Sequence, residues 1–308
     1  MIPDGLSIKV EEVRGMINIA SRRPTTGRWQ IVLVEDADRL SENAANALLK
    51  MVEEPPERTV MLLCAPTDDP EDFSVTLRSR CRHVQLATPT VDAIAQVLTT
   101  RDGLDPDKAR WAASISGGHV GRARRLATDP EARERREQAL KIAAAAQRPA
   151  SAYAAAAELD KYAEADGKKM AAERNQREID ELMVAMGAGG TGKGTASATR
   201  GMKGAVTELE RRQKSRETRT IRDTYDRALI DLAGLYRDAL AASFSAGTTP
   251  SHPDFAAEAA RLATVPPEQL LRCLEAILDC REALSTNVKP KFALAALVAS
   301  LGVATRID

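Results

Sequence analysis

Aromatic residues are scarce in this chain, at 3% of its 308 residues, and cysteine occurs only four times. The cysteines, at positions 64, 81, 273 and 280, include no pair with CxxC spacing. A zinc site built by one chain usually needs such pairs, so the sequence predicts no metal site. Cys273 and Cys280 fall on one face of an expected helix, where buried thiols act as small apolar groups.

Long apolar runs and an excess of one charge are also missing. No stretch approaches the roughly 18 apolar residues that span a bilayer, and the N-terminal residues lack the basic start and apolar core of a signal peptide. The 44 basic and 44 acidic residues cancel, which argues against a dominant nucleic-acid-binding surface. We therefore expect a soluble, cytoplasmic protein of two or three domains with no membrane partner.

The N-terminal part of the chain alternates between helical and strand-like patterns. Apolar positions recur at a helical period over residues 8–20 and again from Ala44 to Val52, in a helix that Ser41 can cap and that Pro55-Pro56 ends. Near-continuous apolar runs over 29–34 and 59–65 predict parallel strands buried on both faces, and residues 82–86 alternate like a short third strand. Strands separated by helices predict a doubly wound parallel sheet.

After Pro89 every pattern is helical. The stretch 186–204 is rich in Gly, Thr and Ser, which predicts a flexible insertion, and its flanks within 161–222 are dense in charge. The candidate helices are 91–101, 106–115, 120–127, 131–147, 151–184, 204–246, 255–263, 267–285 and 290–304.

The insertion nearly matches the phosphate-loop pattern G-x-x-x-x-G-K-[ST] over residues 187–194. Gly194, however, stands where a hydroxyl must bind magnesium, and a helical pattern precedes the segment instead of a buried strand. The segment is therefore interpreted as a linker.

Two short clusters carry the candidate chemistry. Glu35 and Asp36 follow the first strand, where paired carboxylates either hold magnesium through water or simply meet solvent. Arg78 and Arg80 lie in the segment Thr76–Cys81, after the second strand. An arginine placed after such a core commonly reaches a nucleotide held by a neighbouring subunit, and the alternative for Arg80 is a surface salt bridge.

A set of motifs in this order resembles the AAA+ clamp-loader subunits of bacterial DNA polymerase III. The resemblance implies the remainder of an α/β AAA+ core over residues 1–89, with a parallel sheet incomplete at its N-terminus. It further implies an all-α lid over 90–148 and an all-α collar over 149–308 that contains the flexible insertion. The matching motifs are Val32–Leu40, Ala44–Lys50, Glu53–Pro56, Leu62–Pro66 and Thr76–Cys81.

Within this family the triplet Ser79-Arg80-Cys81 is a signature, and the resemblance implies that its arginine, helped by Arg78, faces the ATP site of the adjacent subunit. ATP-hydrolysing relatives carry Asp then Glu at the strand end, whereas this chain has Glu35 then Asp36. They also place an arginine where Gly121 stands. These departures resemble the delta-prime subunit, the stator of the clamp loader.

No glycine-rich phosphate loop occurs in residues 1–30, and the family's chains begin upstream of this start. We therefore expect an N-terminally truncated chain with no zinc, no cofactor and no ATP site of its own, with ATP and magnesium bound by neighbouring subunits. The implied partners are the gamma/tau and delta subunits and, through the complex, the sliding clamp and primed DNA. No polymerase or ATPase activity is expected from the chain alone. The alternatives are a gamma/tau-type ATPase motor and a non-enzymatic AAA+ remnant that acts by interaction.

Overall fold

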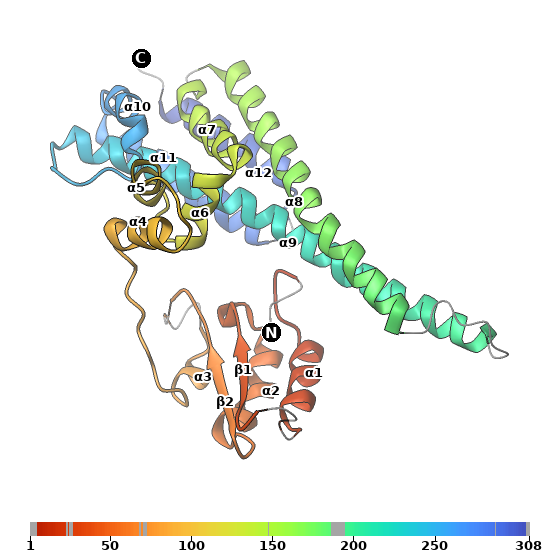
Figure 1. Ribbon diagram of the computed structural model, residues 1–308. Coiled ribbons are helices and arrows are strands. Elements are labelled where there is room, and N and C mark those ends of the chain that lie inside the picture. Colours follow the sequence, from red (N-terminus) through yellow and green to blue (C-terminus); the bar gives the residue numbers. More distant parts are fainter. Residues whose placement is uncertain are drawn as a thin grey trace. The chain divides into compact units, whose positions relative to one another are not determined.

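A computed structural model describes residues 5–22, 24, 27–67, 69, 73–146, 148–185, 195–286 and 288–305. The chain forms two compact units, one of Met1–Gln85 with Met170–Arg219 and one of Leu86–Lys169 with Thr220–Asp308 (Figure 1). The predicted domain boundaries at residues 89 and 148 stay predictions. In the part of the chain that is described, no helix combines the length and apolar character that crossing a membrane requires.

The first unit contains a small α/β arrangement (Figure 1). Two strands pair in parallel, with Gln30 opposite Thr59 and Val34 opposite Leu63. Ser41 accepts a hydrogen bond from the backbone N–H of Ala44 and caps the helix that follows, as its sequence position predicts. The elements are α1 (Val10–Ala20), β1 (Gln30–Val34), α2 (Glu42–Glu53), β2 (Thr59–Leu63) and α3 (Val75–Arg78).

One face of this sheet carries the core of the unit. Val32 and Val34 are buried together with Leu48 of α2 and Leu77 of α3. The opposite face is open, and the side chain of Ile31 is 66% exposed. The predicted burial of both strand faces is therefore wrong, because the helices that share this core pack on the side of Val32 and Val34.

The predicted third strand over residues 82–86 is also wrong. The segment has no regular secondary structure, and Val84 and Leu86 are 72% and 86% exposed. An alternating pattern places side chains on two faces, but a strand forms only where a neighbouring backbone accepts its hydrogen bonds. In the described residues the sheet has two strands, β1 and β2.

In the second unit, three short helices enclose a core of their own. They are α4 (Val91–Thr100), α5 (Pro106–Ser114) and α6 (Val120–Thr128). Ile94 and Leu98 meet Ile115 and Leu126 there, all buried. The sequence predicts each of these helices to within about one residue because Thr90 and Asp105 cap two of them and Pro106 begins the second.

The remaining helices of the second unit surround a larger core. Tyr225 and Tyr236 are its largest buried side chains. Cys273 and Cys280 are buried on one face of a single helix, as predicted, and burial raises the pKa of each thiol to about 11. Contributing helices are α7 (Pro130–Ala145), α8 (Pro149–Ala185, up to residue 169), α9 (Thr195–Ser243, from residue 220), α10 (Ala256–Leu262), α11 (Pro267–Ser285) and α12 (Pro290–Ala304).

The structure shortens the predicted glycine-rich insertion. Helix α9 begins at Thr195 rather than at residue 204, so residues 195–204 are helical. Alanine, threonine and arginine in this segment are compatible with a helix. Each glycine lowers helix stability by only about 1 kcal/mol relative to alanine, and a long helix can form despite this cost. The phosphate-loop-like segment 187–194 lies outside the described residues.

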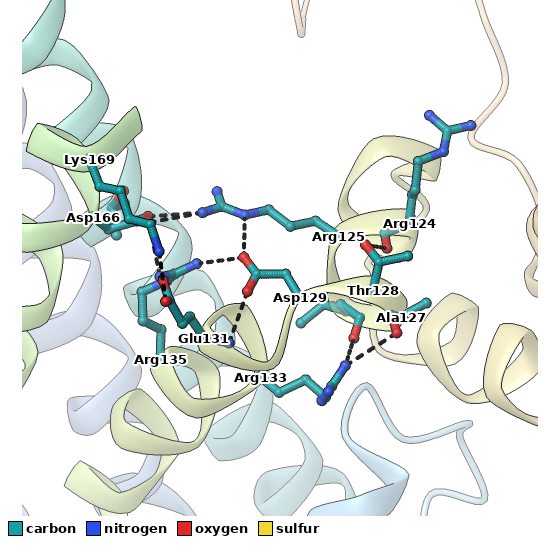
Figure 2. Close-up of polar contacts among 12 residues, drawn as sticks. Arg124, Arg125, Ala127, Thr128, Asp129, Glu131, Arg133, Arg135, Asp166 and Lys169 are labelled. Atoms are coloured by element: carbon teal, nitrogen blue, oxygen red, sulfur yellow. Dashed lines mark hydrogen bonds and ion pairs between the residues drawn. The ribbon is translucent and has the colours of Figure 1, made fainter. Parts of the chain in front are cut away.

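Arginines join three helices of the second unit (Figure 2). Asp166 of α8 accepts hydrogen bonds from Arg125 of α6 at 3.0 and 3.1 Å, and Arg135 of α7 lies 2.9 Å from the same carboxylate. Asp129 caps α7 and lies 3.4 Å from both guanidinium groups. Burial acts against ionisation of Asp129, but the hydrogen bond from Arg125, those from backbone amides and the charge of Arg135 together lower its pKa. Arg133 donates to the carbonyl oxygens that end α6.

A buried histidine fixes the loop before α10. The Nδ1 atom of His252 accepts a hydrogen bond from Arg136 at 2.8 Å, and its Nε2 donates to the carbonyl oxygen of Asp231 at 2.8 Å. Since an arginine can only donate, the imidazole is neutral with its proton on Nε2. Arg136 also donates two hydrogen bonds to the carboxylate of Asp254. Asp238 accepts a hydrogen bond from the backbone N–H of His252.

We expect stability to fall on mild acidification because of His252. Burial, reinforced by the charge of Arg136, lowers its pKa against the opposing charges of Asp231 and Asp238. The unfolded chain therefore takes up a proton that the folded chain excludes. The contribution is fully present above about pH 6.5 and is lost as pH falls below that value toward the folded-state pKa.

Urea unfolding at a series of pH values between 7.5 and 5 measures this loss. A His252→Asn variant should show a smaller drop than the parent chain, whereas a His119→Asn control should keep the full drop. Parallel profiles for the parent and His252→Asn would contradict the assignment.

Candidate functional site

The segment Thr76–Cys81 forms a compact turn anchored in the core of the first unit. Leu77 is fully buried and Phe73 nearly so, which fixes α3 against the sheet. The backbone N–H groups of Arg80 and Cys81 donate to the carbonyl oxygens of Leu77 and Arg78, so the turn continues the coil of α3. The core thus holds the loop while its polar side chains stay at the surface.

Arg80 is held by three acceptors. Its Nε donates to a carboxylate oxygen of Glu53, the last residue of α2. Its Nη1 donates to the carbonyl oxygen of Thr76 at 3.0 Å and to Oγ of Ser79 at 3.3 Å. Within the described part of the chain, no hydrogen bond uses Nη2, so this nitrogen keeps two N–H groups for an external acceptor.

The other residues of the triplet support this arrangement. Ser79 Oγ donates to the carbonyl oxygen of Thr76 at 3.0 Å and so sits beside Nη1 of Arg80. Arg78 ends α3, and its carbonyl oxygen lies 3.0 Å from Nε2 of His83. Cys81 is partly buried, and burial raises the pKa of its thiol, which keeps it in the unreactive protonated form.

The acids at the end of β1 are engaged differently. Asp36 has a left-handed backbone with φ of 50°, and its carboxylate pairs with Arg219 of α9, which belongs to the same unit. Glu35 is half-buried beside it. The structure therefore does not join these acids to Arg80, whose partners are Glu53, Thr76 and Ser79.

In the second unit, Gly121 and Arg122 lie in the first turn of α6. A Cβ added to Gly121 would meet no atom within 4 Å, so the position faces open space. Arg122 pairs with Asp231 of α9, and their side chains are 17% and 6% exposed. Arg122 is thus turned into its own chain and does not replace an arginine at position 121.

Sequence reasoning missed three partners: Glu53 of Arg80, Arg219 of Asp36 and Asp231 of Arg122. Glu53 lies in a recognised motif, but no local pattern ties it to an arginine 27 residues away. The described residues contain no cluster of three or more His, Cys, Asp or Glu side chains suited to a metal ion.

Part of the chain is similar to subunits of DNA polymerase III. A family model described as DNA polymerase III, delta subunit, matches residues 1–90. The chain is 31% identical over 140 residues to the DNA polymerase III subunit delta' of Bacillus subtilis, covering 46% of this chain and 41% of that protein. It is 36% identical over 117 residues to the delta' subunit of Escherichia coli, covering 38% and 34% of the two chains.

A second type of subunit also matches. The DNA polymerase III subunit tau of Escherichia coli is 38% identical over 90 residues, which cover 29% of this chain and 14% of tau. The matched region thus spans less than half the length of each of these relatives. A solved gamma-subunit-related protein from Thermotoga maritima aligns over 99% of this chain and 82% of its own, but its TM-score of 0.41 and 17% identity are too low to show a shared fold.

Proposed function

Since this chain belongs to the DNA polymerase III clamp-loader family of AAA+ proteins and is most like its delta-prime subunits, we propose that it serves as a stator. In this role it does not split ATP itself. It offers Arg80 to the γ-phosphate of ATP held, with magnesium, by a neighbouring gamma/tau motor subunit. The complete complex, which also contains a delta subunit, then opens the sliding clamp and loads it on primed DNA.

The proposal rests on how the guanidinium group of Arg80 is hydrogen-bonded. It is fixed through Nε and Nη1 on an anchored turn, and Nη2 keeps its donors. A guanidinium carries a permanent charge and donates to phosphate oxygens. Positioned donors of this kind neutralise the charge that develops on a transferring phosphoryl group.

Two further contacts favour a stator over a motor. In an active motor, the acid at the place of Asp36 and an arginine at the place of Gly121 would serve the subunit's own nucleotide. Here Asp36 is paired with Arg219, and the nearby Arg122 is paired with Asp231. The similarity to tau keeps a gamma/tau-type motor as the second candidate, and an AAA+ remnant without clamp loading as the third.

Reconstitution tests the three candidates. We expect the purified chain to join gamma/tau and delta subunits of its own organism in one complex during size-exclusion chromatography, and to show no ATP turnover alone. Failure to assemble would favour the remnant. Rapid ATP turnover by the isolated chain would favour the motor.

A further inference from the structure

We propose that Glu53 is a positioning residue for Arg80, which it holds ready to meet the phosphate of the neighbouring subunit's nucleotide. This inference rests on the function proposed above. It assigns a role to one acid of the Glu53–Pro56 motif, and the role follows from the contact that this acid makes.

The two side chains come from separate, firmly packed elements. Glu53 is the last residue of α2, which is anchored by the buried Leu48 and Met51. Arg80 follows α3, which is anchored by Leu77. Because both helices are fixed in one core, the carboxylate and the guanidinium face each other at a set position.

The contacts of Arg80 divide its donors into two groups. Glu53 binds Nε, while the carbonyl oxygen of Thr76 and Oγ of Ser79 bind Nη1. Nη2 is the nitrogen whose N–H groups stay available. A long arginine side chain normally loses rotamer freedom when it binds a partner, and holding it beforehand reduces that loss.

The pair contributes little to folding. The Arg80 and Glu53 side chains are 36% and 46% exposed, and ion pairs at such exposure add little to stability. The neighbouring Glu54 is exposed at the surface. It offers the same charge one position along the chain and is therefore a matched control.

The test uses the reconstituted complex and compares Glu53→Ala with Glu54→Ala. We expect Glu53→Ala to lower the kcat of DNA-stimulated ATP turnover by about two- to tenfold, the cost of ordering one free side chain. The KM for ATP should not change, because the neighbouring subunit binds the nucleotide. Glu53→Gln keeps an acceptor oxygen and should recover part of the turnover.

A double variant that combines Glu53→Ala with Arg80→Ala shows whether Glu53 acts through Arg80. If Glu53 acts through Arg80, the double variant turns over no more slowly than Arg80→Ala alone. Equal turnover for Glu53→Ala and Glu54→Ala, additive losses in the double variant, or impaired assembly with Glu53→Ala would each overturn the inference. Unchanged turnover with Arg80→Ala would overturn the proposed function as well, so the two failures are distinguishable.

Discussion

Replacing Arg80 with alanine is expected to lower the DNA-stimulated ATP turnover of the reconstituted complex by at least about tenfold. An arginine supplied to a neighbour's nucleotide is worth about 10³–10⁵ in rate in other NTPases, and we expect less here because turnover is coupled to assembly of the complex. Arg80→Lys should recover little, because an ammonium group lacks the planar fork of donors. Arg78→Ala should cause a smaller loss.

The folding of the Arg80→Ala chain should be intact, because the ion pair of Arg80 with Glu53 is at the surface. Arg82→Ala is the matched control, since Arg82 is an exposed arginine two positions further on. Steady-state turnover with primed DNA and sliding clamp measures the effect, and a thermal scan checks the fold. If Arg80→Ala and Arg82→Ala gave the same turnover as the parent, Arg80 would have no role in trans.

The largest loss of stability is expected from Asp166→Ala. The Asp166 side chain is 4% exposed and faces two guanidinium groups, those of Arg125 and Arg135 (Figure 2). Removing it leaves two like charges close together, and loss of one partner from a buried ion pair costs about 3–5 kcal/mol. Asp129 still lies 3.4 Å from both guanidinium groups, so we expect a cost of about 3 kcal/mol, at the lower end of that range.

That cost corresponds to a fall of roughly 6–12 °C in the midpoint of thermal unfolding for a unit of this size. Asp92→Ala is the control. Asp92 pairs with Arg110, and their side chains are 78% and 68% exposed. Such an exposed ion pair should contribute less than about 1 kcal/mol to stability. Circular dichroism during heating compares the two variants. Equal midpoints would contradict the structural role of Asp166.

The helices were predictable because their signals are local. Asp129 caps α7, and prolines begin α5, α7, α11 and α12. Apolar spacing also gave the two parallel strands. It could not show which face of each strand would be covered, nor that residues 82–86 would lack a strand partner, because both depend on neighbours that the pattern does not contain.

The candidate site divides in the same way. The triplet Ser79-Arg80-Cys81 was identified from sequence because its residues are adjacent and its motif order is specific to a family. The partners of the charged groups were not, since Arg219 lies 183 residues from Asp36 and Asp231 lies 109 residues from Arg122. Any of 44 basic residues can pair with any of 44 acids until folding brings particular ones together.

Local order along the chain was therefore sufficient for the helices and the two strands, and it marked the segment Thr76–Cys81 as the candidate site. Such features depend on backbone preferences and on spacings of a few residues. The contact between Glu53 and Arg80, the pairing of Asp36 with Arg219 and the burial of Asp166 between two arginines emerged from packing. Each of these contacts joins groups that are distant in the chain, and their geometry exists only once the helices that carry them are in place.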